Sequence, residues 1–288
     1  MQDKICLITG ANAGIGQQTA LELAQMGATV VIVARDPQRG EAARAAIAAT
    51  TGNPRVELLQ ADFASPPSIH AMATSFAARY DRLDVLVNNA GVYLTGRETT
   101  ADGLERTFAV NHLGYFMTTL LLWPSLLAAP SARVINLSSD AHRQAKLNLD
   151  DLQNERKYAG FRAYAQSKLA NVLFTYELDR RRGNAPVTVN AVHPGFVASN
   201  FGRNNRGVIG LVMTRLVPLF AKSVVEGAAT SVYLASSPEV AGVSGRYFVD
   251  CRPVKSAPQS YDRTAAERLW AVSEELTGLR LPSLAHTG

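Results

Sequence analysis

Short apolar runs alternate along the chain with longer segments whose apolar residues recur at helical spacing. The short runs are rich in β-branched residues and predict buried strands at Ile5–Thr9, Thr29–Ala34, Val56–Gln60, Val85–Asn88, Arg133–Leu137, Val187–Val192 and Arg246–Val249. The longer segments are rich in alanine and predict helices that include Ile15–Met26, Arg39–Thr50, Ser68–Arg79, Leu104–Leu127, Phe161–Arg182 and Val224–Ala235.

This alternation predicts a parallel sheet with both faces covered. Strands buried on both faces read as continuous apolar runs, and helical crossovers between parallel strands are right-handed. We therefore expect an α/β fold of the Rossmann type, a doubly wound parallel sheet of about seven strands with helices on both faces. No repeat, low-complexity tract or linker divides the chain, so residues 1–288 are expected to form a single domain. The segment of residues 196–222 mixes Gly, Asn and Arg with apolar residues, and we expect it to form a substrate lid.

Composition narrows the function classes. Of 288 residues, 47% are hydrophobic and 18% charged, and the net charge of +5 comes from scattered basic residues, so no nucleic-acid partner is expected. The two cysteines and five histidines lack metal-ligand spacing, so no metal is expected. Cys6 lies in the first predicted strand, which fits a reducing compartment. The chain starts almost at once with a strand and has no apolar run of ~20 residues, so we expect no signal peptide, no membrane span and a cytoplasmic location.

A glycine-rich turn follows the first predicted strand. Gly10, Gly14 and Gly16 lie between this strand and the next predicted helix. Glycine lets the main chain approach a pyrophosphate, and the free N–H groups of a helix N-terminus bind the anion. Such a turn on its own is weak evidence, but with a strand before it and a helix and a second strand after it, it favours a dinucleotide site.

The end of the second predicted strand bears on the choice between NAD and NADP. In the NAD version of this layout an acidic residue holds the adenosine ribose, and Asp36 is at about the right distance from the glycines. However, Ala34 occupies the tip of the strand and Arg35 comes next, and a guanidinium suits a 2′-phosphate. We therefore predict NADP(H), with NAD(H) as the alternative.

Tyr164 and Lys168 lie one helical turn apart in the segment FRAYAQSKLANVLFTYEL. Transfer of a hydride to a carbonyl builds negative charge on its oxygen, which needs a proton donor nearby. A nearby cation favours the phenolate and lowers the pKa of a tyrosine. We therefore predict that Tyr164 is the general acid/base and that Lys168 lowers its pKa. Ser139 ends the fifth predicted strand, where its hydroxyl could donate to the same oxygen.

The chain resembles the short-chain dehydrogenases/reductases over nearly its whole length. The resemblance rests on Thr9-Gly10-xxx-Gly14-x-Gly16, ADF, NNAG, NHLG, NLSSD, YAQSK and HPG, in the order that the family shows. It implies catalytic roles for Asn111, Ser139, Tyr164 and Lys168, with Lys168 also holding the nicotinamide ribose. It implies cofactor contacts at Gly10, Asn12, Gly14, Ile15, Gly16, Arg35, Asp62, Phe63, Asn89, Ala90, Gly91, Tyr164, Lys168, Pro194, Gly195 and Val197.

Within this family the pattern is most similar to the retinol dehydrogenases and their dehydrogenase/reductase relatives. The similarity lies in DLQNERKYAGFRAYAQSKLANVLFTYEL and in the tail. The connection between Ser139 and Tyr164 is longer than in most members, and we expect this insert, about residues 140–162, to roof the pocket. His142 within it could be a proton shuttle, although a structural role is more common for a loop histidine.

The predicted function is therefore that of an NADP(H)-dependent oxidoreductase that interconverts a lipophilic ketone or aldehyde and its alcohol. A non-catalytic NAD(P)-binding sensor or scaffold of the same fold is the alternative. An extended relative such as a nucleotide-sugar epimerase is disfavoured by the glycine spacing. The helices at Leu104–Leu127 and Phe161–Arg182 form dimer bundles in many family members, and both carry apolar faces here. The long inserts could block that association, so both a homodimer and a monomer stay open.

Overall fold

The computed structural model describes residues 1–195 and 222–282. It contains one eight-stranded sheet, with the strand order β3-β2-β1-β4-β5-β6-β7-β8. The strands are β1 (Ile5–Thr9), β2 (Thr29–Ala34), β3 (Val56–Gln60), β4 (Val85–Asn88), β5 (Ala132–Leu137), β6 (Val187–His193), β7 (Arg246–Val249) and β8 (Arg252–Val254). All neighbours pair in parallel except β7 and β8, which are antiparallel. The predicted Rossmann-type fold is confirmed.

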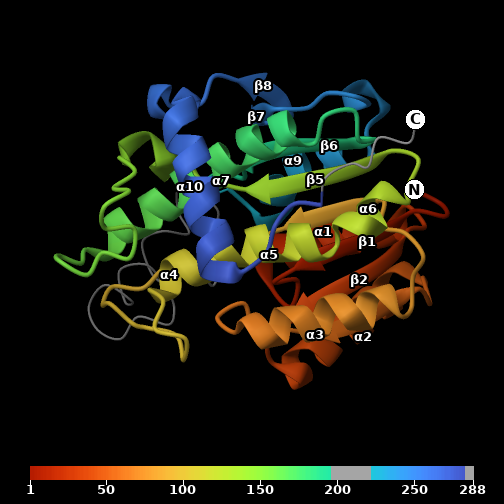
Figure 1. Cartoon of the computed structure of the whole chain (residues 1–288). Helices are drawn as coiled ribbons and strands as arrows, with labels where there is room; N and C mark the ends of the chain where they lie inside the picture. Colours follow the sequence, from red (N-terminus) through yellow and green to blue (C-terminus); the bar gives the residue numbers. More distant parts are fainter. Residues whose placement is uncertain (196–221, 283–288) are drawn as a thin grey trace.

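Helices cover both faces of the sheet (Figure 1). They are α1 (Gly14–Gln25), α2 (Pro37–Thr51), α3 (Pro66–Ala77), α4 (Arg106–Phe108), α5 (Gly114–Leu121), α6 (Trp123–Leu127), α7 (Gly160–Arg181), α9 (Val224–Ser236) and α10 (Arg263–Thr277). Successive residues of a strand point to opposite faces. Val31 and Val33 accordingly join the core cluster that contains residues of α3, α5 and α7, whereas Val30 and Ile32 join the cluster that contains residues of α1, α2 and α9.

The helix predicted over Leu104–Leu127 is interrupted twice. A π-helical turn, Ala109–Leu113, separates α4 from α5, and Leu122 separates α5 from α6. Pro124 lies in the first turn of α6, where its missing N–H costs no hydrogen bond, and it cannot continue α5. The first interruption contains Asn111, so it shapes the candidate site.

Two elements at the C-terminal end were not predicted. Strand β8 follows β7 through a two-residue turn at Asp250 and Cys251, both with positive φ. This edge strand is short, exposed and contains Pro253, so it lacks an apolar signal. Helix α10 crosses α7 and α5 on the outside of the molecule (Figure 1).

Two of the predicted functional features fall on residues 196–221, which lie outside the described residues. These are the substrate lid, of which only Lys222 is described, and Val197 as a cofactor contact. Within the described residues no helix is long and apolar enough to cross a membrane.

Candidate active site

The glycine turn is joined to the end of β4 by hydrogen bonds. Asn89 Nδ2 donates to the main-chain oxygens of Thr9 (2.7 Å) and Gly10 (3.2 Å). The Thr9 hydroxyl oxygen accepts from the main-chain nitrogens of Asn89 (2.8 Å) and Ala90 (2.9 Å). The carboxyl ends of β1 and β4 therefore form one rigid unit, which includes the candidate cofactor residues Gly10, Asn89 and Ala90.

This unit leaves no room for larger residues. Gly10 has φ of +66°, and a Cβ built on it would lie 2.8 Å from the Ala90 Cα. A Cβ on Gly16 would overlap Asn89 Nδ2 and lie 2.7 Å from the Gly10 oxygen. The α1 N-terminus follows directly, and its N-cap residue Ala13 has no side-chain cap. Free N–H groups beside a close glycine turn are what a pyrophosphate requires, so the observed geometry fits a dinucleotide.

Asn12, Gly14 and Ile15 lie on this turn and at the start of α1, and all three are partly exposed. Arg35 is exposed at the end of β2 and has no ion-pair partner among the described residues. The neighbouring Asp36 is the N-cap of α2, where its carboxylate accepts from the Arg39 main-chain nitrogen at 2.9 Å. The acidic candidate is therefore engaged in a cap, while the guanidinium is free to face a 2′-phosphate.

Asp62 and Phe63 follow β3. The Asp62 carboxylate accepts from the Ala64 main-chain nitrogen at 2.9 Å. The Phe63 ring is buried, and a Cβ on Gly114 would lie 3.2 Å from it. The ring is therefore part of the core, so the predicted cofactor contact at Phe63 depends on its main chain.

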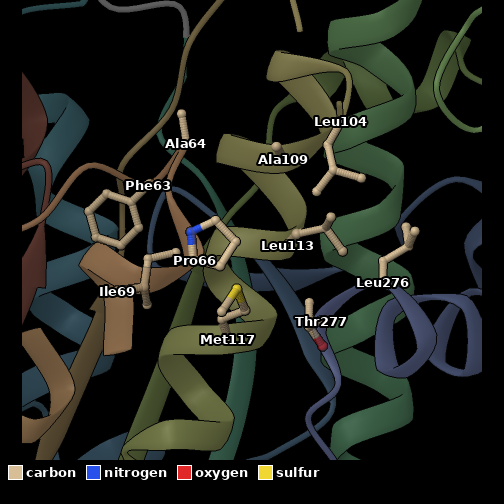
Figure 2. Close-up of a pocket in the computed structure, with 10 residues that line it drawn as sticks. All are labelled: Phe63, Ala64, Pro66, Ile69, Leu104, Ala109, Leu113, Met117, Leu276 and Thr277. Carbon is tan, nitrogen blue, oxygen red and sulfur yellow. The ribbon is translucent and has the colours of Figure 1, made fainter. Parts of the chain in front are cut away.

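Figure 2 shows that Phe63 also lines an apolar pocket. Ile69 of α3, Leu113 and Met117 lie around this pocket, with Leu276 and Thr277 of α10 on its other side. None of the four catalytic candidates lines it. The pocket therefore marks a junction between helices that is separate from the predicted chemistry.

Asn111 is fully buried in the π-helical turn. Its Oδ1 accepts from the Val92 main-chain nitrogen (2.7 Å), and its Nδ2 donates to the Val92 oxygen (2.9 Å) and to the Ser167 hydroxyl (3.0 Å). A Cβ on Gly91 would lie 3.4 Å from Asn111 Oδ1. Asn111 thus joins the segment after β4 to α7, which carries Tyr164 and Lys168.

Lys168 is buried, and its ammonium donates to the Leu137 oxygen at 3.1 Å. The ammonium is 5.7 Å from the Tyr164 ring centroid and 5.6 Å from that of Tyr115. A Cβ on Gly91 would lie 3.6 Å from Lys168 Nζ, so the lysine reaches the carboxyl ends of both β4 and β5.

The two serines that end β5 have different partners. The Ser138 hydroxyl is buried and donates to the Lys168 oxygen at 2.8 Å, which holds the strand against α7. The Ser139 side chain accepts from the Ala141 main-chain nitrogen at 3.3 Å and is hydrogen-bonded to the Tyr164 phenol. Ser139, and not Ser138, is therefore the serine beside the candidate general acid.

Burial controls the ionisation of the pair. It raises the pKa of Tyr164 to about 12, and the hydrogen bond with Ser139 lowers it only in part. Burial also lowers the pKa of Lys168 from its ordinary value of 10.5 to about 7. The sequence argument that a neighbouring ammonium lowers the pKa of Tyr164 is not reproduced, because desolvation opposes both charged forms.

Pro194 and Gly195 follow β6 at the same edge of the sheet. Gly195 has φ of +83°, and a Cβ on it would lie 2.7 Å from the Lys222 side chain. The described candidates from β1, β4, β5 and β6 therefore gather at the carboxyl ends of parallel strands, the usual ligand position in such sheets. Within the described residues no group of three or more His, Cys, Asp or Glu side chains could hold a metal.

Several residues of the site were not singled out from the sequence. Thr9 was quoted only as part of the glycine motif, yet its hydroxyl joins β1 to β4. Tyr93 packs edge-on against Tyr164, with ring centroids 5.7 Å apart. Tyr115 lies four residues after Asn111 and therefore on the same helical face, which is the signal that could have identified it.

Comparison with known proteins identifies one family by sequence and by structure. Residues 4–207 match the family described as short chain dehydrogenase. Retinol dehydrogenase 12 of Mus musculus is 44% identical over 277 residues, which cover 96% of this chain and 87% of that protein. A crystal structure of an uncharacterized protein from Mycobacterium paratuberculosis has a TM-score of 0.78 at 33% identity, covering 98% of this chain and 96% of the other. The NADP active-site complex of Pseudomonas aeruginosa RhlG has a TM-score of 0.69 at 26% identity, covering 86% of this chain and 94% of the other.

Proposed function

Since the chain belongs to the short-chain dehydrogenase/reductase family, in the branch of the retinol dehydrogenases, we propose that this oxidoreductase uses NADP(H) to interconvert a lipophilic aldehyde or ketone and its alcohol. The observation that carries the proposal is the convergence of Tyr164, Ser139 and Lys168 at the carboxyl edge of the sheet. A sensor or scaffold of the same fold would need no hydrogen-bonded phenol and serine at this position.

The proposed cofactor site runs along this edge. Gly10 and Gly16 would let the main chain approach the pyrophosphate, and the uncapped N-terminus of α1 would bind it. Arg35 would hold the 2′-phosphate, while Lys168 would hold the nicotinamide ribose. NADP(H) bound there would supply or accept the hydride. The RhlG structure with NADP supports this choice of nucleotide.

The residues of the chain would then handle the proton. In the reducing direction Tyr164 donates its phenolic proton to the carbonyl oxygen as negative charge develops on it. The Ser139 hydroxyl donates a hydrogen bond to the same oxygen and so stabilises that charge. In the oxidising direction Tyr164 accepts the proton of the alcohol. The pKa of Lys168 is about 7, so the charge that it places beside Tyr164 changes with pH near neutrality.

The substrate class is inferred from the relatives and from the surroundings of Tyr164. The relatives are named retinol dehydrogenases, and retinol is a lipophilic alcohol. The ring of Tyr93 stands edge-on to Tyr164, and Phe161 is about half exposed at the start of α7. These apolar groups favour a substrate with a hydrocarbon body, of which retinal is one candidate.

A panel of lipophilic aldehydes and ketones with NADPH and with NADH, followed at the nicotinamide absorbance, tests the proposal. We expect turnover with NADPH and a loss of at least ~100-fold in kcat for Tyr164→Phe, with NADPH binding retained. Tyr233→Phe is a matched control. The Tyr233 hydroxyl on α9 donates to the Glu239 carboxylate in the turn that follows this helix, and neither residue is a site candidate. Full function of Tyr164→Phe would favour the sensor alternative.

A further inference from the structure

The turn that follows Ser139 contains a histidine with both ring nitrogens engaged. His142 is fully buried within the short helical turn Asp140–Gln144. Its Nδ1 lies 2.7 Å from the Ser139 main-chain oxygen, and its Nε2 lies 3.0 Å from the Ala257 main-chain nitrogen. A main-chain nitrogen can only donate, so Nε2 must be the acceptor. The ring is therefore neutral, with its proton on Nδ1 donated to Ser139.

Residues 255–259, which follow β8, form further hydrogen bonds with the turn that contains His142. Gln259 Nε2 donates within this turn, at 2.8 Å from the Ala145 oxygen and 3.2 Å from the oxygens of His142 and Arg143. Arg143 in turn donates to the Lys255 oxygen at 2.9 Å. The turn after Ser139 is thus fixed to residues 255–259 by side chains from both segments.

Residues 255–259 are themselves anchored to α7. The Tyr176 hydroxyl lies 2.7 Å from the Ser256 hydroxyl, which lies 2.6 Å from that of Ser260. All three side chains are buried. Because α7 also carries Tyr164, a continuous set of contacts runs from Ser139 through His142 and residues 255–260 back to the helix of the candidate general acid.

We propose that His142 is a positioning residue, whose neutral ring fixes the main chain of Ser139 and so sets its hydroxyl against the Tyr164 phenol. The inference rests on the catalytic roles proposed above for these two residues. Neither ring nitrogen of His142 is free to face a substrate, which excludes the proton-shuttle role considered from the sequence. The signal in the sequence was only a histidine three residues after a serine, with nothing to identify Ala257 as its partner.

Protonation of His142 would undo this arrangement. A second N–H, on Nε2, would face the main-chain N–H that now donates to it. Charged and titratable groups around the ring are Asp140 and Arg143 on its own turn, Tyr247 on β7 with its ring 4.9 Å away, and His193 on β6. Burial and Arg143 lower the pKa of His142, so the neutral ring persists at neutral pH.

The tautomer can be read directly without turnover. In ¹⁵N-histidine NMR of the full chain at pH 7, with His142→Asn used for assignment, we expect a neutral His142 ring protonated at Nδ1. A ring protonated at Nε2, or a doubly protonated ring, would overturn the inference. This measurement does not depend on the substrate, so it stands even if no carbonyl compound is reduced.

Kinetics separate positioning from simple stabilisation. An asparagine amide can reach the Nδ1 position and keep the bond to the Ser139 oxygen, whereas leucine cannot. We expect His142→Leu to lose roughly 10- to 100-fold in kcat with little change in the KM for NADPH, and His142→Asn to retain most of kcat. His70→Asn, an exposed histidine on α3, is the matched control and should behave as the wild type.

Thermal melts of the same variants complete the test. Both His142 variants lose the bond to Ala257, so we expect similar falls in melting temperature but different kcat values. Equal losses of kcat in His142→Leu and His142→Asn, or a wild-type kcat in a folded His142→Leu, would refute the positioning role. If the wild type itself reduces no carbonyl compound, the proposed function fails and the tautomer result decides the inference.

Discussion

The ammonium of Lys168 donates a hydrogen bond of 3.1 Å to the main-chain oxygen of Leu137, the last residue of β5. The Asn171 side chain donates to the same oxygen at 3.0 Å. The position of the Lys168 ammonium is therefore fixed by the main chain at the end of β5. Its burial without an ion-pair partner among the described residues lowers its pKa to about 7.

This burial makes the stability of the protein depend on pH. The unfolded lysine keeps its proton up to about pH 10.5, whereas the folded lysine releases it near pH 7. The unfolded state therefore binds more protons between these values, and the free energy of unfolding rises with pH there, by roughly 2 kcal/mol between pH 7 and pH 9. We expect urea titrations of Lys168→Met to lack this rise. Lys157→Met, at an exposed position, should retain it.

The contact between Gly16 and Asn89 predicts a specific failure of cofactor binding. The added Cβ of Gly16→Ala would overlap Asn89 Nδ2, which is held by the Thr9 and Gly10 oxygens and cannot move freely. We expect a loss of roughly 1–3 kcal/mol in stability and at least a tenfold weaker Kd for NADPH, measured by protein fluorescence. A Cβ on Gly96 meets nothing within 4 Å, so Gly96→Ala should bind as the wild type does. Unchanged binding by Gly16→Ala would contradict the proposed position of the pyrophosphate.

The positions of Arg35 and Asp36 predict how cofactor choice can be changed. Loss of a charge-assisted hydrogen bond to a phosphate costs roughly 1.5–3 kcal/mol. We therefore expect Arg35→Ala to raise the KM for NADPH tenfold or more and to leave that for NADH almost unchanged. Asp36→Ala should cost about 1 kcal/mol in stability through the lost cap of α2, with no change in cofactor preference.

Arg44→Ala is the control for a general loss of positive charge, because this arginine lies on α2 and pairs with Glu41. A wild-type preference for NADH, or a loss of NADH activity in Arg35→Ala equal to that for NADPH, would count against the 2′-phosphate role.

The strands could be predicted from the sequence because burial on both faces leaves a continuous apolar run. Five of them, including Ile5–Thr9 and Arg246–Val249, have the predicted bounds, and the other two differ by one residue at one end. The pattern failed where local rules compete. The Asn111 side chain is hydrogen-bonded to the main chain of Val92, and Asn111 lies in a π-helical turn that interrupts the predicted helix. Helical periodicity does not reveal such a turn.

The electrostatics of the candidate site could be predicted only in part. The spacing of Tyr164 and Lys168 brings them onto one helical face, as expected, and Ser139 lies beside Tyr164, while their catalytic roles stay a prediction. The direction of the pKa shift of Tyr164 depends on how much protein surrounds both groups, and that is a property of the tertiary structure. The role of His142 likewise depends on Ala257, which is 115 residues away in the chain.

The packing of α10 on α5 and α7 bears on both the stability and the oligomeric state of the protein. Trp270 on its inner face lies 5.0 Å from Phe116 of α5 and 5.9 Å from Phe174 of α7 between ring centroids, and the Arg181 guanidinium lies 4.6 Å from its ring. His112 Nε2 also lies 2.9 Å from the Ser273 hydroxyl of α10. Helix α10 of the chain itself therefore packs against α5 and α7, which belong to the two helical regions that the family resemblance associates with dimer bundles.

We accordingly expect a monomer of 30.9 kDa in sedimentation equilibrium. Trp270→Ala should lose roughly 3–5 kcal/mol of unfolding free energy in urea titrations, because it removes a buried aromatic ring. Trp270→Phe keeps a ring between the helices and should lose less, while Arg268→Ala, at an exposed position of α10, should lose little. A stable wild-type dimer that Trp270→Ala dissociates would mean that α10 forms the interface instead of covering it.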